Sequence, residues 1–256
     1  MNNATATDDS APVNATTPVA TIRAEEAAHF GKLAAEWWDP KGSSAMLHRL
    51  NPVRLAFIRD AIDAHFLTDT RTIRPLAGRR VLDAGCGAGL LCEPLARLGG
   101  SVTGVDAAPE NIAAARAHAE ASGLAIDYRH GELASLGLSG FDMVCSLEVI
   151  EHVADKGAFL KSLADCMADD GLMILSAPNR TTQSRLLLVE AAERMGMVPR
   201  GTHDWQAFPT PEELAELAAN AGLQLGSPTG IAWSPTRGLH LGEDLSLNFI
   251  VTARKV

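Results

Sequence analysis

From Arg79 onward, short runs of β-branched and other apolar residues alternate with stretches of helical periodicity. This alternation is typical of βαβ units, which place parallel strands in one sheet and cover both faces with helices. We therefore expect an α/β fold with a doubly wound, mostly parallel seven-stranded sheet. The expected strands are 81–84, 101–105, 126–129, 142–146, 172–176, 223–226 and 248–254. The last two are expected to form an antiparallel hairpin at an edge of the sheet.

Helices are expected between these strands, over 90–98, 109–121, 158–167 and 211–220. Pro94 should bend the first of them or confine its regular part. The last is preceded by Thr210-Pro211-Glu212-Glu213, which combines a capping box with proline at the first helical position. Its start is therefore the best defined of the four.

The flanking segments differ in composition from this core. Residues 1–22 are rich in Ala, Thr, Asn and Pro, and we expect a disordered tail there. Residues 23–256 should form one domain, with an N-terminal helical lid over 23–78 and an insertion on the substrate side over 178–209. Within the lid, helical spacing covers 25–38 and a second helix is expected to begin near Pro52. The net charge of −9 argues against a nucleic-acid partner, which needs a basic face.

The loop after the first expected strand reads Gly85-Cys86-Gly87-Ala88-Gly89. Glycines let a backbone approach a ligand closely. A dinucleotide fingerprint would place Gly or Ala three residues after Gly87, where this chain has Leu90. The loop instead follows an acidic residue, Asp83, which suits the ammonium group of a methionine moiety. We therefore expect the loop, through Gly85 and Gly87, to hold S-adenosylmethionine.

Two carboxylates are expected to anchor this cofactor. Asp83 would face the methionine ammonium directly or through water, and the alternative is a cap at the strand end. Asp106 follows the second expected strand, about 20 residues beyond the loop, and would accept both ribose hydroxyls.

The segment Glu148-Val149-Ile150-Glu151-His152 follows the fourth expected strand, where open α/β sheets bind their ligands. If it is helical, its three titratable residues share one face. In one interpretation His152 is a general base that Glu151 or Glu148 orients. In the other, all three bind a divalent cation such as Mg²⁺ that lowers the pKa of a phenol. A phenol has a pKa near 10, so about 0.1% is ionised at neutral pH and either device would raise that fraction.

Further motifs make the chain resemble one family. They are Phe30, Trp37-Trp38-Asp39, the stretch Leu47-His48-Arg49-Leu50-Asn51-Pro52-Val53-Arg54, the glycine loop, Glu148-x-x-Glu151-His152, Asn179-Arg180 and Gly201-Thr202-His203-Asp204. In order and without large gaps, these resemble the ubiquinone-biosynthesis O-methyltransferase family from about Glu25 to the C-terminus. The glycine loop alone indicates only a class I methyltransferase.

The resemblance implies methylation of a 2-polyprenyl-6-hydroxyphenol and of 3-demethylubiquinol. It places the cofactor at Arg54, Gly85, Asp106 and Leu147, and a metal at Glu148, Glu151 and His152. Leu147 departs from the methionine of some members, a change that conserves volume and should still pack on the adenosine. Arg54 would pair with the methionine carboxylate if the N-terminal helices fold across the site.

The stretch 180–200 combines apolar residues with four arginines in an otherwise acidic chain. It is either a lid helix or an amphipathic segment that touches anionic lipid and admits a polyprenyl tail. We expect a cytoplasmic protein, with peripheral contact at the inner membrane and with other ubiquinone-biosynthesis proteins as further partners. Two alternatives stay open: a class I methyltransferase of another small hydroxylated molecule, and a membrane adaptor that binds S-adenosylmethionine without turnover.

Overall fold

The computed structural model describes residues 31, 36–42, 44–187 and 204–256. Within these residues nine strands form one sheet, in the order β3-β2-β1-β4-β5-β9-β7-β8, with β6 pairing along β9. The strands are β1 Arg80–Ala84, β2 Ser101–Asp106, β3 Asp127–His130, β4 Phe141–Leu147, β5 Met167–Pro178, β6 Leu223–Leu225, β7 Thr229–Ser234, β8 Gly238–Gly242 and β9 Asn248–Lys255. Strands β3, β2, β1, β4 and β5 pair in parallel, whereas the pairs made by β9 and β7 are antiparallel.

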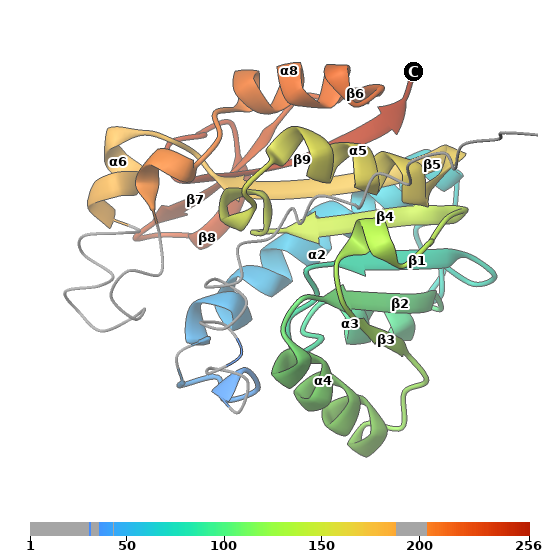
Figure 1. Cartoon of the computed structure of the whole chain (residues 1–256). Helices are drawn as coiled ribbons and strands as arrows, with labels where there is room; N and C mark the ends of the chain where they lie inside the picture. Colours follow the sequence, from blue (N-terminus) through green and yellow to red (C-terminus); the bar gives the residue numbers. More distant parts are fainter. Residues whose placement is uncertain (1–30, 32–35, 43, 188–203) are drawn as a thin grey trace, which may run out of the picture.

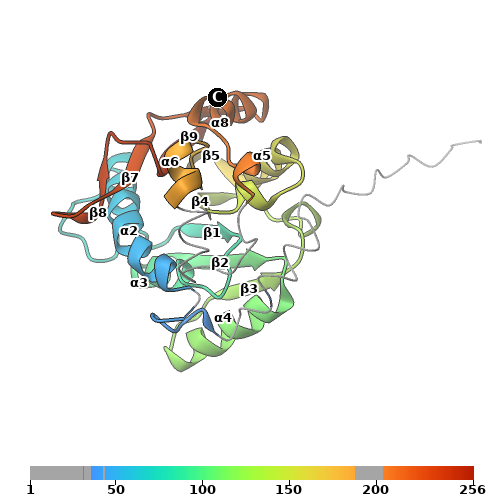
Figure 2. The same ribbon diagram turned by 90° about the vertical axis from the view of Figure 1, so that its left-hand side faces the viewer.

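Helices cover both faces of the sheet, as Figures 1 and 2 show. They are α2 Ala45–Phe66, α3 Cys92–Arg97, α4 Pro109–Ala121, α5 Lys156–Cys166, α6 Thr182–Ser184 and α8 Pro211–Asn220, with 3₁₀ turns η2 Leu133–Ser135, η3 Ile150–His152 and η5 Trp205–Ala207. The apolar side chains of α2, α3 and α4 pack on one face, and those of α5 and α8 on the other. The strands between them are buried almost throughout, as expected for a sheet covered on both sides.

The order of the parallel strands reverses between β1 and β4. Val81 of β1 lies opposite Val102 of β2 on one side and Met143 of β4 on the other. In such sheets ligands bind beyond the carboxyl ends of the strands, at this reversal. We therefore expect a ligand-binding site at the loops after β1, β2 and β4.

The expected fold class is confirmed, and each expected strand lies within or next to an observed one. The helix over 109–121 is α4, and the helix after Thr210 is α8 with its capping box in place. Pro94 lies in α3, whose regular part is only six residues long. Of the expected domain boundaries, the tail 1–22 and most of 23–35 lie outside the described residues.

The sheet of the described residues has nine strands where seven were expected, and its antiparallel part differs from the expectation in two respects. The strands 223–226 and 248–254 do pair antiparallel, but β9 lies between β5 and β7 and is not at an edge. The hairpin of β7 and β8 was not expected at all, because glycine and serine interrupt its apolar pattern. Gly230 in β7 is needed there, since a Cβ atom would overlap the backbone of Asp244. Contacts between residues distant in sequence thus determine the strand order in the antiparallel half of the sheet.

Helix α2 begins at Ala45, seven residues before the expected start at Pro52. A proline inside a helix removes a hydrogen bond and costs about 3 kcal/mol. Two contacts from the same part of the helix oppose this cost: Asn51 Nδ2 donates to the Leu90 carbonyl (3.1 Å), and His48 Nε2 lies 2.8 Å from the Trp37 carbonyl. None of the helices in the described ranges is long and apolar enough to span a membrane.

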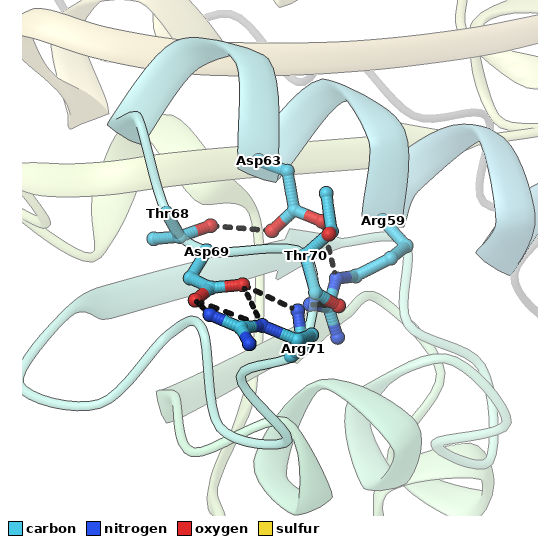
Figure 3. Close-up of polar contacts among 6 residues, drawn as sticks. All are labelled: Arg59, Asp63, Thr68, Asp69, Thr70 and Arg71. Carbon is cyan, nitrogen blue, oxygen red and sulfur yellow. Dashed lines mark hydrogen bonds and ion pairs between the residues drawn. The ribbon is translucent and has the colours of Figure 1, made fainter.

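The C-terminal end of α2 is held by a polar cluster (Figure 3). Asp63 accepts hydrogen bonds from Arg59 (2.8 Å) and Thr68, and the Arg71 side chain pairs with Asp69 (2.7 Å). At this end His65 contacts the carbonyl of Asp170 in β5, near the amino end of that strand. The cluster therefore fixes the end of α2 away from the ligand-binding edge and is structural.

Candidate active site

The glycine loop after β1 is closely covered by side chains from elsewhere in the chain. Gly85, Gly87 and Gly89 have φ values of 78°, 52° and 87°, which favour glycine. A Cβ atom at Gly85 would overlap Val149, and one at Gly89 would overlap the Tyr128 hydroxyl. At Gly87 a Cβ would lie 2.5 Å from the ring of Trp37. The three glycines therefore serve close packing as well as the turn.

Asp83 is buried under this loop. The Cys92 thiol donates to its carboxylate at 3.2 Å. Burial raises the pKa of Asp83 to about 7; the thiol hydrogen bond lowers it and the nearby Asp106 raises it further. The expected contact with a methionine ammonium stays a prediction, because the carboxylate is buried and its hydrogen bond is to Cys92.

Asp106 at the end of β2 is tied to the glycine loop, and its contact with the ribose hydroxyls stays a prediction. It accepts hydrogen bonds from the backbone N–H groups of Gly87 (2.8 Å) and Ala108 (2.9 Å) and from Asn111 Nδ2 (3.1 Å). Burial raises the pKa of Asp106, although these donors oppose the shift. The structure thus brings together two of the predicted cofactor residues, Gly87 and Asp106, at the ends of adjacent strands.

Glu148 follows Leu147, the last residue of β4, and has a φ of 57°. This backbone conformation is uncommon for a side chain larger than glycine. The Glu148 carboxylate accepts hydrogen bonds from Ser176 Oγ (2.8 Å) and from Asn248 Nδ2 (3.0 and 2.9 Å). Sequence reasoning missed Ser176 and Asn248; the available signal was that each is a polar residue at the site end of a buried strand.

Arg54 of α2 reaches the same carboxylate, so this helix contacts the turn after β4. Its Nη2 lies 3.1 Å from Glu148 Oε1, and only 3% of the arginine side chain is exposed. The contact has the distance of an ion pair but not the direction of a hydrogen bond. As a result Nη2 and Nε of Arg54 have no hydrogen-bond acceptor among the described residues.

Glu151 and His152 lie in the 3₁₀ turn η3. Both carboxylate oxygens of Glu151 are buried and have no hydrogen-bond partner in the described part of the chain. Burial and the nearby Glu148 raise the pKa of Glu151 to about 8. His152 Nε2 lies 4.0 Å from Glu151 Oε1. A neutral imidazole beside a carboxyl group can accept a proton from a hydroxyl.

The three expected metal ligands do not form the single helical face that their spacing suggested. Glu148 precedes the turn in a left-handed conformation and is already bound by three side chains. In the described ranges no group of three His, Cys, Asp or Glu side chains is arranged to hold a metal ion. As they stand, these residues do not fit a divalent cation.

Comparison with known proteins identifies the class of enzyme. Residues 46–227 match the model of a methyltransferase domain. Magnesium protoporphyrin IX methyltransferase from Synechocystis PCC 6803, solved with bound SAM, superposes with a TM-score of 0.61 at 18% identity. That match covers 95% of this chain and all of the other. The fold, the glycine loop and its acidic partner define a class I S-adenosylmethionine-dependent methyltransferase.

Relatives with higher sequence identity show to which family within this class the chain belongs. Ubiquinone biosynthesis O-methyltransferase from Azorhizobium caulinodans is 46% identical over 92% of this chain and 94% of its own length. The protein of the same name from Bradyrhizobium diazoefficiens is 47% identical over the same shares. The chain therefore belongs to the ubiquinone biosynthesis O-methyltransferase family and is an S-adenosylmethionine-dependent O-methyltransferase.

Proposed function

We propose that the enzyme methylates phenolic or catechol hydroxyls of polyprenylated ubiquinone precursors, at both O-methylation steps. The observation that carries this proposal is the similarity to its named relatives, which extends over 92% of the chain and so spans the glycine loop and the turn after β4. A similarity confined to the glycine loop would support only the identity of the cofactor and not that of the methyl acceptor.

The bound cofactor supplies an electrophilic methyl group on a sulfonium centre. In our proposal the acceptor hydroxyl gives its proton to His152 as its oxygen forms the new bond to carbon. The charge on the resulting imidazolium, 4.0 Å from Glu151 Oε1, lowers the pKa of Glu151, so that the ionised Glu151 carboxylate stabilises the charged ring. Arg54 and Glu148 hold α2 across the strand ends. Alignment of the reacting groups adds to the rate, by up to about 7–11 kcal/mol in favourable cases.

Activation of the hydroxyl by Mg²⁺ is the second candidate. Its support is the pair of buried Glu151 oxygens that have no partner among the described residues. It would require Glu148 to exchange its present partners for a cation. Two matched assays of methyl transfer, one after exhaustive chelation and one after Mg²⁺ is restored, distinguish activation by His152 from activation by the metal. Full activity without the metal would leave His152 as the base.

The substrate proposal is tested by methyl transfer to a short-chain demethylubiquinol and to a 2-prenyl-6-hydroxyphenol, with unprenylated catechols as controls. We expect turnover of both prenylated compounds. Turnover restricted to unprenylated compounds would favour a methyltransferase of another hydroxylated molecule. Cofactor binding without transfer to any catechol would favour the membrane adaptor.

We also propose that the protein is cytoplasmic and that its residues 180–200 contact the anionic surface of the inner membrane. Other enzymes of ubiquinone biosynthesis would supply its substrate at that surface. Of this stretch only 180–187 is described. Leu186 and Leu187 are half exposed there, which supports the proposal. Arg180 is paired with Glu213 and so is less available to lipid. Sedimentation with vesicles that contain or lack anionic lipid tests the contact.

A further inference from the structure

The indole of Trp37 covers the glycine loop. Its ring packs against Gly87, so closely that a Cβ atom there would lie 2.5 Å from the ring. The indole Nε1 atom is buried and has no acceptor among the described residues. A buried donor without a partner costs free energy, so an acceptor at this position would stabilise the arrangement.

Contacts of the neighbouring Trp38 and of the Trp37 backbone fix the segment that carries Trp37 to the glycine loop, to α4 and to α2. Trp38 Nε1 donates to the carbonyl of Ala88 in the glycine loop at 3.0 Å. The Trp38 ring stacks on His118 of α4, with centroids 3.4 Å apart and an interplanar angle of 1°. His48 of α2 lies 2.8 Å from the carbonyl of Trp37 itself. One indole N–H of the pair is therefore used to fasten the segment, whereas the other, on the ring that packs on Gly87, has no acceptor among the described residues.

Arg54 presents the same feature from α2. Its Nε and Nη2 atoms are buried without a hydrogen-bond acceptor in the described part of the chain. Trp37 thus offers a buried donor that lacks an acceptor, and Arg54, although its Nη2 faces the Glu148 carboxylate at 3.1 Å, keeps donors that make no hydrogen bond among the described residues. S-adenosylmethionine carries one anionic group, the carboxylate of its methionine part, which can accept several hydrogen bonds.

We propose that Trp37 is a cofactor-binding residue whose indole Nε1 donates a hydrogen bond to the methionine carboxylate of S-adenosylmethionine. The ring packs on Gly87 and sets the direction of the N–H, while Arg54 supplies the opposite charge. This assignment depends on the cofactor class and not on the methyl acceptor.

Binding of two ligands by calorimetry tests the proposal. S-adenosylhomocysteine has the carboxylate, and 5′-methylthioadenosine has the same nucleoside without the amino acid. We expect Trp37→Phe to weaken S-adenosylhomocysteine about 10- to 100-fold, because a hydrogen bond to a charged group is lost. Binding of 5′-methylthioadenosine should change by less than about twofold, which also shows that the variant is folded.

Trp233→Phe is the matched control, since Trp233 is exposed on β7; it should leave both affinities unchanged. The proposal is overturned if Trp37→Phe binds S-adenosylhomocysteine as the parent does. It is also overturned if both ligands weaken equally, because the acceptor would then lie on the nucleoside.

A second measurement uses the unaltered protein. The chain has four tryptophans, so its indole N–H signals can be assigned by NMR with single Trp→Phe variants. We expect the Trp37 signal to move downfield with S-adenosylhomocysteine and to stay in place with 5′-methylthioadenosine. No movement with either ligand, or the same movement with both, would contradict the assignment. Neither measurement involves the methyl acceptor, so failure here is distinct from failure of the substrate proposal.

Discussion

At the scale of single residues, the site is built from carboxylates that are buried to different degrees. Asp106 is bound by three N–H donors, Glu148 by three side chains, and Glu151 by no hydrogen bond among the described residues. Desolvation raises a carboxyl pKa and donors lower it. The sequence places all three near the cofactor, but the difference in their environments arises from partners on other strands.

Asp83 should make stability depend on pH. Below about pH 4 its carboxyl group is protonated in both the folded and the unfolded chain. Between pH 4 and its folded pKa of about 7, the folded protein keeps a proton that the unfolded chain has released. The free energy of unfolding of the ligand-free protein should therefore fall as pH rises through this range, and stay level above it. We expect a decrease of about 2–4 kcal/mol, measured by urea unfolding.

Asp83→Asn should remove most of that decrease, because the amide oxygen still accepts from Cys92 and carries no charge. Asp165→Asn, at an exposed position on α5, should leave the pH dependence as in the parent. A parental pH dependence in Asp83→Asn would show that another group is responsible.

At the scale of elements, the contact between Trp38 and α4 decides how the N-terminal segment lies on the glycine loop. His118 of α4 stacks on Trp38, and its Nδ1 lies 2.5 Å from the carboxylate of Glu93 in α3. The Glu93 side chain is only 4% exposed, and its other partner, Arg97, is 3.4 Å away. One histidine thus joins two helices and the segment that carries Trp37.

His118→Ala should weaken both links. It removes the stacking partner of Trp38 and leaves the buried Glu93 carboxylate with a single distant cation. We expect a loss of about 1–3 kcal/mol in the free energy of unfolding, together with weaker binding of S-adenosylhomocysteine. Chemical unfolding and calorimetry measure the two effects.

His118→Phe is the matched control, because it keeps an aromatic ring against Trp38 and removes only the contact with Glu93. It should lose stability and retain most of the ligand affinity. If His118→Ala bound the ligand as tightly as the parent, the stacking would have no role in the site.

At the scale of the whole molecule, the proposed cofactor site joins parts that lie far apart in sequence. The loop after β1, the end of β2 and the N-terminal half of α2 all meet there. A ligand that binds them only in the folded state stabilises the entire domain by mass action. Methyltransferase activity and global stability are therefore linked through one ligand.

S-adenosylhomocysteine at about 100 times its dissociation constant should add about 2.7 kcal/mol to the free energy of unfolding. For a chain of this size that corresponds to a rise of about 5–10 °C in Tm. NAD⁺ at the same concentration should give no rise, because Leu90 occupies the position where a dinucleotide loop needs a small residue. A rise with NAD⁺ and none with S-adenosylhomocysteine would contradict the cofactor assignment.

The sequence by itself determined the parallel half of the sheet, the glycine loop and its acidic partners. These follow from periodicity and turn chemistry that act over a few residues, and strands β1 to β4 are found where they were expected. The sequence also identified the residues of the turn after β4 but not their conformation. Glu148 has a left-handed backbone conformation, and its partners come from β5, β9 and α2.

Only the tertiary structure decided how distant segments close the site. Proline at position 52 indicated a helix start in the sequence, yet α2 continues through it, and the hydrogen bond from Asn51 to the Leu90 carbonyl opposes the cost. Likewise nothing local indicates that Trp37 should cover Gly87 while its neighbour stacks on α4. The contacts of Asn51, Trp37 and Trp38 join residues 39 to 80 positions apart, so their energy appears only when the sheet has brought them together.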